Sequence, residues 1–203
     1  GAIRDVLQNH LLQVVALLAM EPPAGSDSQY LQDEKAKVLS AMRAIDPRQV
    51  VRGQYVGYRD EPGVETDSTV ETYVAARLEI DSWRWAGVPF YLRTGKRMRK
   101  RSSEISIVFK DTPHSIFGEE AGRHRNVLSI RLQPNEGMTL GVTIKEPGPG
   151  GMRLVNVPLD MTFADALGPD GGEQVEAYER LIMDVIRGAG AEALTVATRA
   201  TSR

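Results

Sequence analysis

The chain has 203 residues, which is enough for one large domain or two small ones. Hydrophobic residues make up 41% of it and charged residues 26%, a composition that excludes a disordered, collagen-like or coiled-coil protein. The 25 Lys and Arg against 27 Asp and Glu give a net charge of −2, which excludes a general polyanion binder but leaves room for a local basic cluster. The chain has no cysteine, which excludes disulfides and thiolate chemistry and fits a reducing compartment, so we expect a cytoplasmic protein.

The first 45 residues show apolar residues at the spacing typical of helices. Apolar residues recur at helical spacing over residues 3–18, and Pro22 ends this helix because proline cannot continue one. The stretch is too polar to cross a membrane. No capping residue precedes it, so we expect that the chain begins inside a larger fold. A second amphipathic helix is predicted from about Tyr30 to Ile45 and is closed by Pro47.

After these helices the spacing of apolar residues changes from about 3.6 to 2 residues, which is typical of strands with one buried face and one face nearer to solvent. The alternation is strongest over residues 69–80, 105–109, 128–132 and 138–144, and weaker over residues 50–56, 89–93 and 152–157. A last helix is predicted over Glu173–Ile186, followed by a weakly patterned tail that frays. The order of elements predicts an α+β fold with one large, mostly antiparallel β-sheet and helices packed on one side.

Two common kinds of site are not predicted. The chain has no Gly-x-Gly-x-x-Gly between a strand and a helix and no Walker A loop. Residues 148–151 and 168–172 are rich in glycine, but both contain proline and are interpreted as turns. The segment 134–137 between two strands is typical of a hairpin connection. His10, His114 and His124 lack metal-ligand spacing, so no metal site is expected.

Polar residues gather on the first helix. With 3.6 residues per turn, Asp5, Asn9 and Gln13 line up at four-residue spacing. His10 then lies about 140° from Asp5 and nearer to the apolar stripe. The plainest interpretation of His10 is a core histidine hydrogen-bonded to a neighbour. The carboxamides beside it favour a ligand site instead, because several polar groups at one helix end need partners.

The segment Arg93–Arg101 concentrates positive charge. Six of its nine residues are basic and none is acidic, and it lies on a predicted loop between two strands. Such a loop attracts phosphate, since lysine offers a point charge and arginine a forked donor. Nucleic-acid recognition usually brings a wider basic surface or stacking aromatics, so a small phosphorylated ligand is favoured over a polymer. A merely solvated loop explains the charge equally well.

Several segments, in order along the chain, resemble motifs of the glucose-6-phosphate dehydrogenase family. They are Arg4–Gln13, Ala19–Pro23, Val51–Tyr55, Trp85–Phe90, Leu92–Lys96, Gln133–Glu136 and Ala177–Asp184. The resemblance implies that residues 1–187 form the C-terminal α+β domain of such an enzyme and that the Rossmann domain is absent from this chain. Residues 188–203 do not resemble the last segment of the family and are taken as a divergent tail.

The resemblance also implies a function. The family oxidises β-D-glucose 6-phosphate to the 1,5-lactone with hydride transfer to NADP or NAD, as the first step of the pentose phosphate pathway. By this match His10 is the catalytic base, Asp5 contacts the sugar hydroxyls, and Lys96 and Arg101 bind substrate. The base assignment is chemically reasonable, because a neutral imidazole can accept the C1 hydroxyl proton as hydride leaves C1. The family sheet implies a homo-oligomer, and neither nucleic acid nor membrane is expected as a partner.

The departures from the family limit what this chain does alone. The Gly-rich nucleotide loop is missing, as is the segment that supplies the carboxylate partner of the base, so NADP would be bound mainly by a domain outside this chain. We therefore expect an inactive fragment, with a non-catalytic dimerisation or sugar-phosphate-binding module as the alternative. The second, structural NADP site of some members is not expected. Arg131 matches one ligand, but Ser102, Ser106, Thr139 and Gly141 replace basic or aromatic ones.

Overall fold

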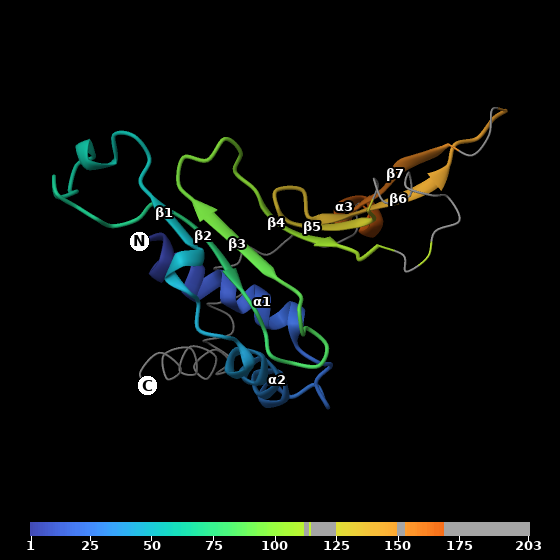
Figure 1. The fold of residues 1–203 in the computed structure, drawn as a ribbon, viewed down its shortest axis with the longest axis horizontal. Coiled ribbons are helices and arrows are strands. Elements are labelled where there is room, and N and C mark those ends of the chain that lie inside the picture. The colour runs from blue at the N-terminus through green and yellow to red at the C-terminus, as the bar shows by residue number, and fades with distance from the viewer. Residues whose placement is uncertain (112–113, 115–124, 150–152, 169–203) are drawn as a thin grey trace. The chain divides into compact units, whose positions relative to one another are not determined.

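The computed structural model describes residues 1–111, 114, 125–149 and 153–168 (Figure 1). The helix predicted over Glu173–Ile186 and the tail 188–203 lie outside the described residues. The described residues divide into two compact units, the first over residues 1–98 and the second over residues 99–168. The helices and strands are η1 Ile3–Leu11, α1 Leu12–Ala19, α2 Ser28–Ala41, η2 Pro47–Gln49, β1 Val50–Gly53, η3 Tyr58–Asp60, β2 Tyr73–Leu78, β3 Phe90–Gly95, β4 Ser103–Val108, β5 Val127–Gln133, β6 Gly137–Lys145, β7 Leu154–Thr162 and α3 Phe163–Leu167.

The first unit is built on an antiparallel sheet of order β1-β2-β3. Its central strand alternates as predicted: Val74, Ala76 and Leu78 are buried, whereas the residues between them are half-exposed. The same side continues beyond the strand, with Thr72 only 3% exposed and Ile80 only 2%. One face of this sheet therefore packs against the core, as expected when side chains alternate between the two faces of a strand.

Helices cover that buried face. Val15, Ala16 and Ala19 of α1 pack against Leu78 and Ile80 in one core cluster, to which α2 adds Val38. In Figure 1, the helix formed by η1 and α1 runs beside the sheet, and α2 lies on the far side of α1. The end of α1 is fixed by Trp85, whose indole N–H donates to the Ala19 carbonyl over 2.9 Å.

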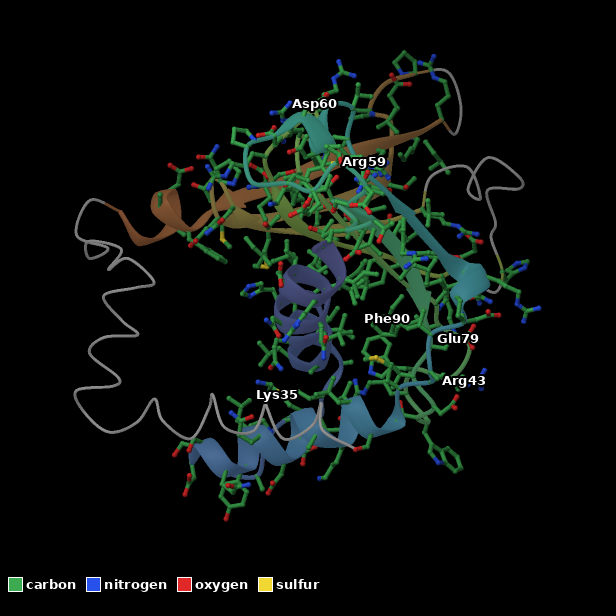
Figure 2. All side chains as sticks on the ribbon, turned by 90° about the vertical axis from the view of Figure 1, so that its left-hand side faces the viewer. Lys35, Arg43, Arg59, Asp60, Glu79 and Phe90 are labelled. Carbon is green, nitrogen blue, oxygen red and sulfur yellow. The ribbon has the colours of Figure 1, made fainter. Side chains whose placement is uncertain are left out.

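The second helix starts and stops for identifiable reasons. The Asp27 side chain caps α2 by accepting from the Gln29 backbone N–H over 3.1 Å. The helix ends at Ala41 rather than at the predicted Ile45, because Met42 leaves it to form an antiparallel bridge with Ile80. Arg43 then pairs with Glu79 over 2.8 Å, and both are labelled together in Figure 2. Tertiary pairing with the sheet therefore overrides the helical pattern of residues 42–45.

The second unit contains an antiparallel sheet of order β4-β5-β6-β7. Its register places apolar side chains opposite one another on one face, as in the row Leu128, Leu140 and Leu159. Serine, threonine, asparagine and aspartate occupy much of the other face. The hairpin predicted at 134–137 is confirmed, since β5 ends at Gln133 and β6 begins at Gly137. The short helix α3 was not predicted.

The predicted fold class is confirmed: the described residues combine helices with strands that pair only in antiparallel fashion. The strands are divided between a three-stranded and a four-stranded sheet rather than placed in one. Among the described residues, no helix has both the length and the apolar character needed to span a bilayer.

Arg131 ties three strands of the second unit together. Its guanidinium donates to the hydroxyl of Thr139 on β6 and, over 2.8 Å, to the carboxylate of Asp160 on β7. It also donates to the backbone carbonyls of Asn135 and Met161, over 3.1 Å and 3.3 Å. The residue that matched a ligand of the family's structural NADP site thus has four acceptors within its own unit.

The Asp160 carboxylate gives this network a pH dependence. Hydrogen bonds from the Thr139 hydroxyl and Arg131 hold the pKa of Asp160 below its usual range. A lowered folded-state pKa adds stability above the pKa of an unfolded aspartate, and that stability is lost as the pH falls through the folded value. We expect Asp160→Asn to lower the unfolding midpoint at pH 7, with the gap to the parent chain closing between about pH 5 and pH 2. Thermal melts followed by circular dichroism test this, and a gap that persists at pH 2 contradicts it.

Candidate functional site

The helix that carries His10 is not an α-helix at that point. Residues Ile3–Leu11 form a π-helix, whose hydrogen bonds join residues five apart, as in the bond from the Leu12 N–H to the Leu7 carbonyl. Asp5 and His10 are separated by five residues, so this winding stacks them on one face. The predicted separation of about 140°, which assumed 3.6 residues per turn, is therefore wrong. Short π-helical segments occur frequently at functional sites.

The same helix divides its residues between core and solvent. Leu7 is buried against the sheet together with Ala2, in a cluster with Val74 and Ala76. Asp5 and His10 are both exposed. The interpretation of His10 as a core histidine is therefore wrong, because the π-helical winding turns it away from the apolar side of the helix.

A distant residue caps the start of η1. The Glu71 carbonyl accepts from the Ala2 N–H, and its carboxylate accepts from the Ile3 N–H, both over 2.9 Å. Partial burial alone would raise the pKa of Glu71, but the hydrogen bond from Ile3 and nearby cations bring it below the usual value. An ionised carboxylate at a helix N-terminus satisfies free N–H groups and complements the helix dipole. The sequence offered no local cap because the cap comes from the approach to β2.

Asp5 lies in a positive environment. The charges of Arg4 and Lys96 act to lower the pKa of its carboxyl group. The carboxylate lies within electrostatic range of the Lys96 side chain, since β3 packs along η1. The fold brings together Asp5 and Lys96, two of the predicted site residues.

Lys96 follows directly after β3. Its backbone N–H donates to the carbonyl of buried Thr72 over 2.9 Å, while the residue itself is exposed. The strand can end in this way because the preceding residue is Gly95: a Cβ there would lie 2.8 Å from the Tyr73 ring and 3.1 Å from the Met98 sulfur. A close packing contact thus fixes the main chain immediately before the lysine.

The basic segment is not uniform in the structure. Arg97 is paired with Glu61 and stacks over the Tyr55 ring, so its positive charge is balanced by a carboxylate of the first unit. Arg101 is exposed and belongs to the second unit. Its assignment to the site rests on the resemblance alone.

Two hollows in the described part of the surface are lined by other residues. One in the first unit is lined by Arg43, Asp46, Gln49, Arg77 and Glu79, among others. One in the second unit is lined by residues that include Lys100, Arg131, Asn135, Asp160 and Thr162. His10, Asp5 and Lys96 line neither of these hollows, and all three are exposed. Within the described part of the chain, no group of three or more His, Asp or Glu is arranged to hold a metal ion.

Comparison with known proteins identifies relatives of one kind. The family model described as "Glucose-6-phosphate dehydrogenase, C-terminal domain" matches residues 1–195. The glucose-6-phosphate 1-dehydrogenase of Rhizobium meliloti (strain 1021) is 53% identical over 204 residues, covering 92% of this chain and 40% of that protein. The cytoplasmic glucose-6-phosphate 1-dehydrogenase 5 of Arabidopsis thaliana is 45% identical, covering 93% of this chain and 36% of that protein.

Solved structures agree with these relatives. A crystal structure of glucose-6-phosphate 1-dehydrogenase from Mycobacterium avium matches with a TM-score of 0.80 and 43% identity, covering 93% of this chain and 39% of that one. A glucose-6-phosphate dehydrogenase solved in complex with its substrate glucose-6-phosphate matches with a TM-score of 0.83 and 38% identity, covering 94% of this chain and 40% of that one. The chain thus spans about 40% of the length of the relatives it matches.

Proposed function

The chain belongs to the glucose-6-phosphate dehydrogenase C-terminal domain family, and from this premise we propose that it is the substrate-binding part of an enzyme that oxidises β-D-glucose 6-phosphate. The observation that carries the proposal is the shared exposed face of Asp5 and His10 on η1, with Lys96 within electrostatic range of Asp5. A structural relative solved with glucose-6-phosphate adds support.

Each site residue has a distinct role in this proposal. The cation of Lys96 binds the phosphate, and the Asp5 carboxylate accepts hydrogen bonds from sugar hydroxyls. Arg101 is proposed as a substrate ligand on the resemblance alone. His10 accepts the proton of the C1 hydroxyl as hydride leaves C1. Binding energy from the remote phosphate is used to hold C1 in position for this transfer.

The cofactor is assigned to another part of the protein. NADP, or NAD in its place, would supply the hydride acceptor when bound. The described residues offer no Gly-rich turn between a strand and a helix, and therefore no backbone cradle for a pyrophosphate. We accordingly propose that this chain binds the sugar phosphate but does not turn it over alone.

Assembly and location complete the proposal. One face of the β4–β7 sheet carries apolar side chains, among them Leu159 at 57% exposure and Ile144 at 40%. We propose that a homodimer forms through the antiparallel sheet, because apolar faces of this kind are commonly covered by a partner.

The cytoplasm is the proposed location, in line with the named cytoplasmic relative from Arabidopsis thaliana.

Calorimetric titration of the chain with glucose 6-phosphate tests the binding role. We expect saturable binding, and we expect Lys96→Ala to weaken it at least about tenfold, because a charge-assisted hydrogen bond contributes about 1.5–3 kcal/mol. Lys37→Ala is the matched control, since Lys37 is an exposed lysine of α2 paired with Glu34. Equal affinity for glucose and glucose 6-phosphate in the folded chain contradicts a phosphate site at Lys96.

A second measurement separates a fragment of an enzyme from a complete one. When glucose 6-phosphate and NADP are added to the chain, we expect no rise in absorbance at the wavelength of reduced nicotinamide. Binding without turnover fits both the substrate-binding part of a dehydrogenase and a non-catalytic sugar-phosphate module. Turnover at an enzymatic rate overturns the proposal that the cofactor is held elsewhere.

A further inference from the structure

The residue after Lys96 has an unusual backbone. Arg97 adopts φ = 54°, in the left-handed region that residues other than glycine rarely occupy. Such conformations persist only where the surroundings over-determine them, and they gather at binding and catalytic sites. The turn that follows Lys96 therefore requires something to hold it.

The side chain of Arg97 supplies that hold. Its guanidinium pairs with the Glu61 carboxylate and lies over the Tyr55 ring, 4.5 Å from the ring centroid. The Tyr55 hydroxyl donates to the same Glu61 carboxylate over 3.2 Å. Tyr55, Glu61 and Arg97 thus contact one another in a closed triangle, which we call the Arg97 clamp.

The clamp and Lys96 are fixed to one buried residue. The Thr72 hydroxyl accepts from the Tyr55 N–H over 3.0 Å, and the Thr72 carbonyl accepts from the Lys96 N–H over 2.9 Å. Thr72 is only 3% exposed, so it is a rigid point of attachment. Hydrogen bonds to Thr72 therefore fix both Tyr55 of the clamp and the main chain of Lys96.

We propose that the Arg97 clamp is a positioning device that orients Lys96 toward a phosphorylated ligand, and that Arg97 itself is not a phosphate ligand. The inference rests on the proposed role of Lys96 in binding glucose 6-phosphate. It goes beyond that role because it separates two neighbouring cations of the basic segment. The Arg97 charge is neutralised by Glu61, whereas Lys96 forms no ion pair with another residue in the described part of the chain.

The decisive variant is Glu61→Gln. If the basic segment binds phosphate by charge alone, removal of a nearby negative charge strengthens binding. If the clamp orients Lys96, loss of the Glu61 charge releases Arg97 and weakens binding. We expect Glu61→Gln and Arg97→Ala each to raise the Kd for glucose 6-phosphate about three- to tenfold in the 203-residue chain. The double variant should bind no more weakly than either single variant, because both changes break the same contact.

A charge exchange and a melt complete the experiment. Arg97→Glu alone should abolish binding, and Arg97→Glu combined with Glu61→Arg should recover much of it by restoring the pair. The single variants should melt close to the parent chain, because exposed ion pairs add little stability. Tighter or unchanged binding by Glu61→Gln overturns the clamp while leaving the proposed function in place. A folded parent chain that fails to bind glucose 6-phosphate overturns the proposed function, and the inference with it.

Discussion

Replacing His10 with asparagine should lower kcat by about 10²- to 10⁴-fold in an enzyme completed with a dinucleotide-binding part. The reason is that His10 is exposed on η1, on the face it shares with Asp5, where it can accept the C1 hydroxyl proton. Asparagine is polar and fills a similar space but cannot take up that proton. A chimera in which this chain replaces the matching part of the Rhizobium meliloti relative allows turnover to be followed by nicotinamide reduction.

The same chimera offers a matched control. His114→Asn removes a second exposed histidine, located in the second unit, and should leave kcat and KM unchanged. A base acts in the chemical step, so His10→Asn should reduce kcat far more than it raises KM. If His10→Asn costs less than about threefold in kcat while the chimera is active, His10 is not the base.

A second large effect is expected from Gly137→Ala at the start of β6. A Cβ built on Gly137 would lie 2.2 Å from the Met161 carbonyl oxygen and 2.9 Å from the Thr162 Cα, both backbone atoms of β7. Backbone atoms within a paired strand cannot retreat without breaking the ladder. Forced overpacking usually costs about 1–3 kcal/mol and occasionally more, and we expect about 3 kcal/mol here. Urea unfolding of the parent chain and the variant measures this loss.

Gly141→Ala, in the same strand, is the control for that substitution. The atom nearest to its Cβ would be the Asn156 side-chain oxygen at 3.2 Å, which can rotate away. We expect its effect to stay within about 1 kcal/mol. Equal destabilisation by the two variants would mean that loss of glycine from the strand matters, and not the contact with β7.

The sheet of the first unit shows what local sequence can predict. The alternation over residues 69–80 correctly identified the buried side, because side chains of a strand point to opposite faces in turn. The weaker prediction at 50–56 was confirmed as β1, which is shorter, and that at 152–157 as β7, which is longer. Strand ends depend on partners, and a single segment does not contain that information.

The site shows where prediction from sequence stops. An apolar stripe with a period of 3.6 cannot reveal a change to i→i+5 hydrogen bonding, so the common face of Asp5 and His10 was missed. The cap from Glu71 was missed because it comes from a residue 68 positions away from Ile3. The sequence shows Arg97 as one cation of a basic segment, but it does not show that Arg97 is paired with Glu61, which lies 36 residues earlier. In each case a long-range contact determines what the local pattern cannot.

Glu71 and Thr72 are consecutive residues, and each anchors a different part of the proposed site. The first holds the beginning of η1, and the second holds the main chain of Lys96. The two anchoring carbonyls belong to adjacent peptide units that meet at the Cα of buried Thr72. An insertion between positions 71 and 72 would therefore move the start of η1 relative to Lys96, whereas a change of length within residues 62–67 leaves both anchors adjacent.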